Sequence, residues 1–224
     1  QSIDAFAEVE KLGRYDGPLN LARVLEREGR IDEAVEALQR AAAHGTSKDD
    51  PPAPRWTLQW LTGRLNRQQG RLKEAEDNLR AVLEERTPEM IERNFDFSGD
   101  YEVINLLGLT LFDLAKAVRV EGAPERKLLL QKAAATFEKT LAIDSENVTA
   151  HHNLHQIYEE LGDKTKAESH NAEHLKVKSD DNAQGRAVGL ARAKYPAANL
   201  AAEALVIYPL QREGAPGLNA NNKT

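Results

Sequence analysis

Small residues recur at matching positions in four successive segments of the chain, and this recurrence constrains the fold more than any other feature. Each segment has the pattern of two helices joined by a turn. Two helices can cross closely only where the side chains at the contact are small. The small residues are Ala34, Ala75, Ala133 and Ala167 on the second helices, and Ala22, Gly63 and Gly108 on the first helices. The pattern therefore predicts helix pairs that pack through close crossings.

Glycines mark the turns within three of these segments. Gly29, Gly70 and Gly162 each stand where a first helix should end, a place where a left-handed backbone conformation is easily adopted by glycine. We expect first helices to begin near residues 18, 56, 101 and 148. The alternative is an irregular helical bundle whose alanines coincide by accident.

The segments resemble the tetratricopeptide repeat (TPR), a helix pair of about 34 residues. The strongest matches are GRIDEAVEALQRAA, GRLKEAEDNLRAVL and YEELGDKTKAESHNAEHL. The resemblance implies an all-α, right-handed solenoid of helix pairs. The expected array covers residues 1–179, as a partial repeat over 1–14 and repeats near 15–48, 56–89, 101–145 and 148–179.

Three parts of the chain depart from this regular plan. About a dozen extra residues separate Gly108 from Ala133, which predicts either longer helices or a protruding loop near Gly122. Residues 180–208 should form C-terminal capping helices, and residues 209–224 a mobile tail. The half-repeat at the start fits either the C-terminal part of a longer repeat protein or an N-terminal capping helix.

Composition excludes several classes of function. Among the 224 residues there is no cysteine, which rules out disulfides, thiolate zinc sites and c-type haem attachment within this chain. The net charge of −6 disfavours nucleic acid and anionic membranes as partners. No apolar run reaches the roughly 18 residues of a membrane span. Phosphate-binding and nucleophile-elbow motifs are also missing, so we predict no enzyme and no catalytic residue.

A narrower resemblance concerns the segments NFDFSGDYEVINLLGLTLFDLAK and LAAEALVIYPLQREGAPG. They are similar to TPR segments that follow multihaem c-type cytochrome domains in bacteria. This similarity implies an exported protein, periplasmic or extracellular rather than cytoplasmic, within an electron-transfer assembly. A multihaem cytochrome would then be the partner. Haem would lie only in that partner or in an upstream domain, because the chain has no Cys-x-x-Cys-His.

The TPR resemblance also implies a concave groove, lined by the first helices, that binds a segment of a partner protein. The positions expected to line it are Leu19, Arg23, Arg27, Trp60, Arg64, Arg67, Asn105, Leu109, Phe112, His152 and Gln156. The first half of this set is basic around a tryptophan. Arginine binds carboxylates and tryptophan anchors interfaces, so the expected partner segment is net acidic. The alternative is that these arginines only solvate a helix face.

Histidines gather in the last repeat, which holds five of the six in the chain. His151 and His155 lie four residues apart on one expected helix, and His170 and His174 on the next. Such pairs share a helix face and can bind zinc, nickel or copper. We expect His174 to pack against His155. These four residues are the candidates for an alternative function as a metal-binding or haem-ligating domain. The competing interpretations are a hydrogen-bonded network of histidine and asparagine between the helices, or histidines that only lie at the surface.

Overall fold

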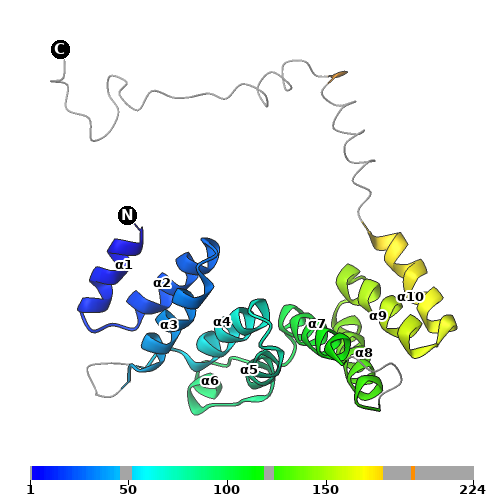
Figure 1. The fold of residues 1–224 in the computed structure, drawn as a ribbon, viewed down its shortest axis with the longest axis horizontal. Coiled ribbons are helices and arrows are strands. Elements are labelled where there is room, and N and C mark those ends of the chain that lie inside the picture. The colour runs from blue at the N-terminus through cyan, green and yellow to red at the C-terminus, as the bar shows by residue number, and fades with distance from the viewer. Residues whose placement is uncertain (1, 46–51, 119–123, 179–192, 195–224) are drawn as a thin grey trace. The chain divides into compact units, whose positions relative to one another are not determined.

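The computed structural model describes residues 2–45, 52–118, 124–178 and 193–194. The chain divides into two units, residues 1–178 and 179–224, and the helices described below belong to the first. Within the described part of the first unit there are ten α-helices and no β-strand (Figure 1). The predicted all-α solenoid is therefore confirmed. The predicted capping helices over 180–208 and tail over 209–224 lie outside the described residues, apart from residues 193–194, which are helical.

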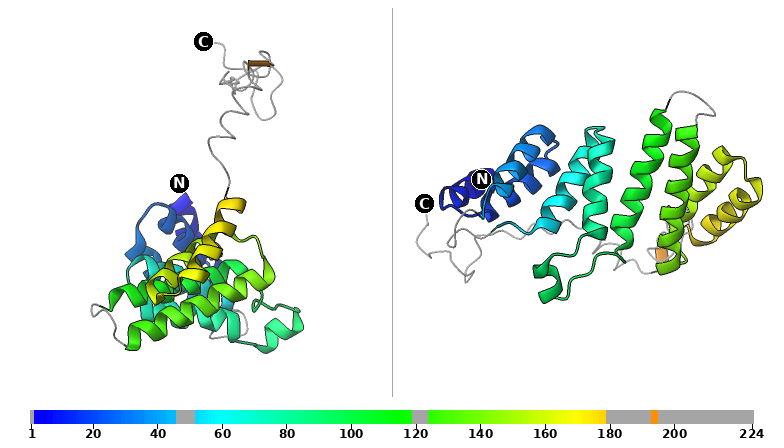
Figure 2. Two further views of the ribbon diagram at one scale, coloured as in Figure 1. Left: turned by 90° about the vertical axis from the view of Figure 1, so that its right-hand side faces the viewer. Right: turned by 90° about the horizontal axis from the view of Figure 1, so that it is seen from below.

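A lone first helix precedes four helix pairs. The helices are α1 (Ser2–Lys11), α2 (Asp16–Arg27), α3 (Ile31–Ala42), α4 (Arg55–Gln68), α5 (Leu72–Glu84), α6 (Pro88–Glu92), α7 (Tyr101–Ala117), α8 (Pro124–Ile143), α9 (Val148–Leu161) and α10 (Lys164–Val177). The first helices of the pairs start within two residues of the predicted positions. Each helix packs against the next in chain order, except that α5 contacts α7 directly (Figure 2). The short α6 projects from this row of helices in the right-hand view.

Small residues hold the helix pairs together as predicted. Ala34, Ala75 and Ala133 have no exposed surface, and Ala167 is 2% exposed. A Cβ atom added to Gly108 would lie 2.8 Å from the Phe137 ring, a distance that a well-packed core does not accommodate. The helix pairs can approach this closely only because these positions carry little or no side chain.

The turn glycines adopt the expected conformation. Gly29, Gly70 and Gly162 have φ angles of 77°, 73° and 79°. An L-residue with a side chain rarely adopts this left-handed region, whereas glycine does so without steric strain. These residues therefore reverse the chain between the helices of three pairs.

Long helices account for much of the extra length in the third pair. Helices α7 and α8 have 17 and 20 residues, more than any other helix among the described residues. The position expected to form a protruding loop, near Gly122, lies outside the described residues.

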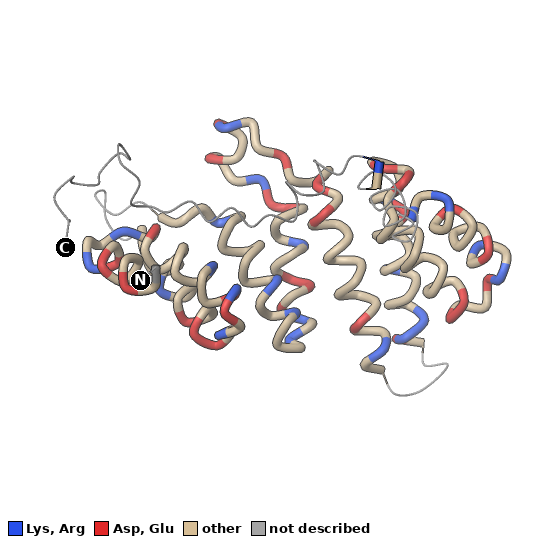
Figure 3. The backbone as a smooth tube through the Cα atoms, turned by 90° about the horizontal axis from the view of Figure 1, so that it is seen from above, with Lys and Arg blue, Asp and Glu red and all other residues tan. Residues whose placement is uncertain are grey.

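Two clusters of buried apolar side chains form the core of the first unit. One is built from α2, α3 and α4, and the other from α5, α7, α8, α9 and α10. Trp60 packs against both clusters and is only partly buried. Charged residues of both signs are spread along the helices around this core (Figure 3). None of the helices in the described ranges has the length and apolar character needed to cross a bilayer.

Candidate functional site

A hollow of about 410 Å³ lies between α2 and α4. Four of its lining side chains, Arg23, Arg27, Trp60 and Arg64, belong to the predicted groove. The others are Glu26, Leu61 and Gln68. Residues more than thirty positions apart in the sequence therefore converge on one surface, because two successive first helices present the same face. We call this surface the basic hollow.

Arg64 is held in place inside the basic hollow. Its guanidinium carbon lies 5.7 Å from the centre of the Trp60 ring, and Nη2 lies 2.9 Å from Oε1 of Glu26. The Glu26 side chain is only 11% exposed, and its Oε1 has no hydrogen bond of good geometry. A nearly buried carboxylate needs a compensating positive charge. Glu26 therefore fixes the guanidinium of Arg64 over the tryptophan ring, an arrangement that cation–π attraction stabilises further.

The other two arginines of the basic hollow are less committed. Both side chains are exposed, and Arg23 donates one hydrogen bond of 3.2 Å from Nη1 to Oδ1 of Asn20. Arg27 makes no hydrogen bond or ion pair with any residue in the described ranges. Since Arg64 is neutralised by Glu26, these two guanidinium groups give the hollow a net positive charge that is available to a ligand.

Arg67, one turn after Arg64 on α4, forms an ion pair with the next helix pair. Its Nη2 donates to Oδ2 of Asp113 on α7 at 2.6 Å, and the two side chains are 28% and 33% exposed. This ion pair joins the second helix pair to the third. The predicted role of Arg67 in partner binding is therefore weaker than that of Arg27, because a ligand would have to compete with Asp113.

Two residues predicted to line the groove belong to the core instead. Leu19 is 6% exposed and Phe112 is 1% exposed. Leu19 packs among the side chains of α2, α3 and α4, and Phe112 lies on α7, which contacts α5, α8 and α9. Contacts with three helices enclose the Phe112 side chain and leave it unavailable to a partner. Leu109 on the same helix is partly buried against this core.

Asn105 supports the fold through a polar network. Its Nδ2 donates to Oδ1 of Asn147 at 3.1 Å, and its Oδ1 accepts from Oγ1 of Thr140 at 2.9 Å. The same Oδ1 of Asn147 accepts from the backbone N–H of Ala150 and so caps α9. The network links α7, α8 and α9. Asn105 was expected to face a partner, and its amide side chain serves this network instead.

The histidines of the last pair form separate contacts. His151 is buried, with Nε2 3.0 Å from the carbonyl oxygen of Ser145 and Nδ1 3.1 Å from Nδ1 of His170. A carbonyl only accepts, so Nε2 of His151 carries a hydrogen, and in the neutral pair Nδ1 of His170 donates to Nδ1 of His151. His170 also stacks on Tyr158 at 5.7 Å. Burial, followed by the charge of His151, lowers the pKa of His170 below its ordinary value.

The expected contact between His155 and His174 is not formed. Nδ1 of His155 lies 3.1 Å from the carbonyl oxygen of Ala167, whereas Nδ1 of His174 lies 3.3 Å from that of Val148. His174 instead faces His152, with ring centres 5.0 Å apart. Throughout the described ranges, no group of three or more histidine, aspartate or glutamate side chains is arranged to hold a metal ion. Of the four candidate ligands, His151 and His170 contact each other, whereas His155 and His174 each meet a backbone carbonyl oxygen.

His152 and Gln156, the last two predicted groove residues, contact each other. Nε2 of His152 lies 3.2 Å from Nε2 of Gln156, one turn further along α9. Burial, and then the charges of His174, His155 and Lys178, lower the pKa of His152. This end of the predicted groove therefore carries neutral imidazole rather than positive charge near pH 7, unlike the basic hollow.

Two features escaped the sequence analysis. Glu26 holds Arg64 in the basic hollow, but its position in the sequence does not distinguish it from acidic residues on other helix surfaces. A cluster of aromatic rings, Trp56, Phe95 and Phe97, forms where α4 begins and where the segment after α6 returns. Two phenylalanines in an irregular linker, in the sequence NFDF, were the available signal for this cluster.

Comparison with known proteins supports the repeat assignment. Residues 19–90 match a family model described as tetratricopeptide repeat. A search of curated proteins found no match. A crystal structure of MamA is 18% identical with a TM-score of 0.56, covering 78% of this chain and 85% of that one. The MamA 41-end structure from Desulfovibrio magneticus RS-1 is 15% identical with a TM-score of 0.52, covering 74% and 76%.

At these levels of identity the structural similarities show the fold alone. The narrower resemblance to repeats associated with multihaem cytochromes gains no support from them. The sequence match to the family covers the helices around the basic hollow, and the solved structures extend the same architecture over most of the chain. Residues 19–90 are therefore similar in sequence to the tetratricopeptide repeat, and the described helices form an all-α solenoid of that type.

Proposed function

We propose that this protein is a non-catalytic interaction scaffold that binds a segment of a partner protein across the first helices α2 and α4. One observation carries the proposal: Arg23, Arg27, Trp60 and Arg64, which come from two repeats, line a single hollow of about 410 Å³. Surface arginine and tryptophan are the residue types that contribute most to protein interfaces. A hollow that combines them has the chemistry of a binding site for a peptide segment.

The partner segment should carry a carboxylate next to an apolar side chain. Arg27 and Arg23 supply guanidinium groups that can bind a carboxylate through paired hydrogen bonds. Trp60, partly buried between the two core clusters, supplies an apolar wall for the neighbouring side chain. The ion pair of Arg67 with Asp113 bounds this surface on the side of α7. The preferred ligand is therefore an acidic, partly apolar segment centred on α2 and α4.

Site-specific photocrosslinking can identify the partner. A photoreactive amino acid at Gln68, which lines the basic hollow, should crosslink the partner in cells, and the same amino acid at the exposed Lys73 on α5 should not. Equal capture at both positions would count against this surface. The captured protein would then be purified and its affinity measured by calorimetry.

Charge-reversed variants then test the site itself. Arg27→Glu should weaken binding of the purified partner, and most strongly at low salt. An exposed charge acts chiefly on the association rate and is screened by ions. Lys73→Glu changes the net charge by the same amount. Because Lys73 lies on α5, the second helix of its pair, this variant should bind the partner with unchanged affinity. Trp60→Ala should weaken binding at any salt by about 2 kcal/mol or more. Equal effects of the two charge reversals would contradict the proposal.

Two finer hypotheses accompany this proposal. A multihaem c-type cytochrome as the partner would be supported by Cys-x-x-Cys-His motifs in the protein captured by the crosslinker. Metal or haem ligation in the last repeat is the alternative function. Its support is limited, because the Nδ1 atoms of His151, His155 and His174 already contact groups within the chain. A zinc-dependent rise in melting temperature that His155→Ala abolishes would favour it.

A further inference from the structure

The segment between α5 and α7, residues 85–100, is an insertion with its own ordered structure. Thr87 caps α6 by accepting a hydrogen bond from the backbone N–H of Met90 at 3.2 Å. Met90 on this short helix is 2% exposed. After α6, Asn94 adopts a left-handed φ of 54°, and the N–H of Phe95 returns to the carbonyl oxygen of Met90 at 2.8 Å. The backbone of the insertion is therefore fixed by local hydrogen bonds and one buried side chain.

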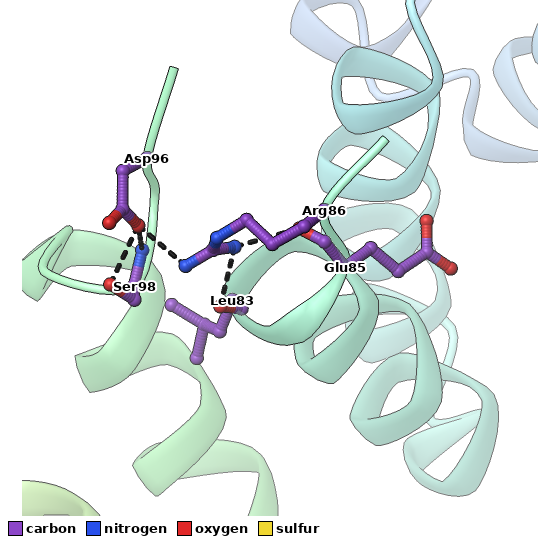
Figure 4. Close-up of polar contacts among 5 residues, drawn as sticks. All are labelled: Leu83, Glu85, Arg86, Asp96 and Ser98. Atoms are coloured by element: carbon purple, nitrogen blue, oxygen red, sulfur yellow. Dashed lines mark hydrogen bonds and ion pairs between the residues drawn. The ribbon is translucent and has the colours of Figure 1, made fainter. Parts of the chain in front are cut away.

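Arg86 joins the two ends of the insertion (Figure 4). Its Nη1 donates to the carbonyl oxygens of Leu83 and Glu85 at 3.2 and 2.7 Å, at the end of α5. Its Nη2 donates to Oδ1 of Asp96 at 2.6 Å, and the same oxygen accepts from the N–H and hydroxyl of Ser98. One guanidinium thus ties the departing chain to the returning chain.

This ordered insertion presents aromatic rings at the surface. Phe95 lies edge-on to Trp56 at 5.5 Å, and Phe97 lies 6.3 Å from Trp56 and 6.0 Å from Phe95. Phe95 is 40% exposed and Tyr101, at the start of α7, is 42% exposed. We call Trp56, Phe95, Phe97 and Tyr101 the aromatic platform. Apolar rings held in fixed positions at a surface are typical of protein interfaces, because no ordering cost is left to be met on binding.

Acidic residues surround the aromatic platform. A hollow of about 470 Å³ beside it is lined by Asp96, Asp100 and Glu102 together with Phe97 and Tyr101. Residues 85–102 contain six acidic residues and two arginines. Asp96 is paired with Arg86 and Asp100 accepts hydrogen bonds from the backbone, whereas the Glu102 carboxylate is exposed and makes no hydrogen bond or ion pair with the described residues. The surface is therefore apolar at its centre and negative at its rim.

We propose that the aromatic platform is a second docking surface, which binds a basic, partly apolar segment of another protein. Exposed rings accept lysine or arginine over their faces as well as apolar side chains. The carboxylates at the rim attract the same cations and repel an acidic segment. The preference is thus opposite to that of the basic hollow, where guanidinium groups surround Trp60. This proposal does not depend on partner binding at the basic hollow.

The two tryptophans, four residues apart on α4, give one signal for each surface in one sample. The chain contains only Trp56 and Trp60, one in each surface. Labelling the whole chain with 5-fluorotryptophan gives two fluorine resonances, which Trp56→Phe and Trp60→Phe assign. The probe is the capped peptide Arg-Leu-Lys-Leu-Arg. Its controls are the charge-reversed peptide Glu-Leu-Asp-Leu-Glu and the apolar-depleted peptide Arg-Gly-Lys-Gly-Arg.

The basic apolar probe should shift the Trp56 resonance saturably, and each control peptide should shift it less. Glu102→Gln should lower the affinity for this probe about threefold, the change expected when one exposed ion pair is lost. Glu168→Gln removes another exposed carboxylate, from α10, and should have no effect. Phe95→Ser should abolish the saturable shift, with the dispersion of the remaining fluorine and amide resonances as the test of folding.

Three results would overturn the proposal. The first is a Trp56 resonance that does not respond to the basic apolar probe at millimolar concentration. The second is an equal response to the charge-reversed peptide, which would show that the acidic rim does not select the ligand. The third is equal weakening by Glu102→Gln and Glu168→Gln, which would show attraction to the net negative chain rather than binding at the platform.

Discussion

Gly108→Ala tests whether the crossing of α7 and α8 is as close as the structure shows. The added Cβ would lie 2.8, 2.9 and 3.0 Å from three carbon atoms of the Phe137 ring. Unstrained carbon contacts begin at about 3.5 Å. Phe137 has no exposed surface, so its ring can move only by displacing other core side chains. We therefore expect the alanine variant to strain the core.

The expected magnitude follows from two opposing effects. Overpacking in a well-packed core destabilises by about 1–3 kcal/mol. Replacing glycine by alanine inside a helix stabilises by about 1 kcal/mol. The net loss for Gly108→Ala should be about 1 kcal/mol, which corresponds to a melting temperature lower by about 2–4 °C for a chain of this size.

Gly63→Ala is the matched control, because it brings the same gain in helix propensity to α4. There the added Cβ would lie 3.1–3.2 Å from Leu79 and Asn78, a milder contact than that at Gly108. Urea unfolding should rank Gly63→Ala as the more stable of the two variants by about 1 kcal/mol. A Phe137→Leu background should reduce the cost of Gly108→Ala. Equal stability of both alanine variants would refute the close crossing.

Three further changes test other parts of the structure. Lowering the pH from 7.5 to 5 should reduce the protection factors for amide hydrogen exchange in α9 and α10 before those in α2 and α3. Burial and His151 lower the pKa of His170 in the folded protein. The stability that the neutral ring contributes is therefore complete above about pH 6.5 and is lost as the pH falls below that value. An equal loss of protection in all four helices would contradict this. Asn105→Ala should cost about 1–3 kcal/mol in urea unfolding, since Thr140 and the cap of α9 lose their partner. Met90→Ala should increase exchange within residues 85–100 while α9 and α10 stay protected, and increased exchange in α9 and α10 as well would contradict a local role.

The helix pairs could be predicted from the sequence because close packing restricts residue size at fixed positions. Ala75 and Ala133 have no room for a larger side chain, and that restriction repeats whenever the helix pair repeats. Gly70 likewise reports a left-handed turn, which few other residues adopt. These are local steric requirements, so they can be recognised without knowledge of the neighbouring repeat.

The surface of each helix was harder to predict, because exposure depends on how many neighbours a helix has. Phe112 occupies a position that the resemblance assigns to the groove. Helix α7, however, contacts α5, α8 and α9, so this side chain is enclosed. Arg27 lies near the end of α2, beside a hollow rather than under a third helix, and stays exposed. Positions that the resemblance assigns to the groove can therefore be core in one repeat and surface in another.

The histidine contacts lay beyond prediction for a related reason. A spacing of four residues places His151 and His155 on one face of α9, but it does not say which group of α10 each ring will meet. His151 meets a side chain, His170, whereas His155 meets the backbone carbonyl of Ala167. The difference depends on the offset between the two helices, which the sequence pattern leaves undetermined.

The position of the aromatic platform bears on how partner choice can change in such a protein. In a repeat array the core positions are constrained by both neighbouring helices, so a substitution there affects stability before it affects binding. The insertion is held by Arg86, Thr87 and Met90, whereas the Phe95 ring and the Glu102 carboxylate, in the first turn of α7, are exposed. Substitutions at Phe95 or Glu102 can therefore alter the surface chemistry without altering the packing of α5 against α7. A specific surface on an irregular insertion can diverge while the solenoid that supports it stays the same.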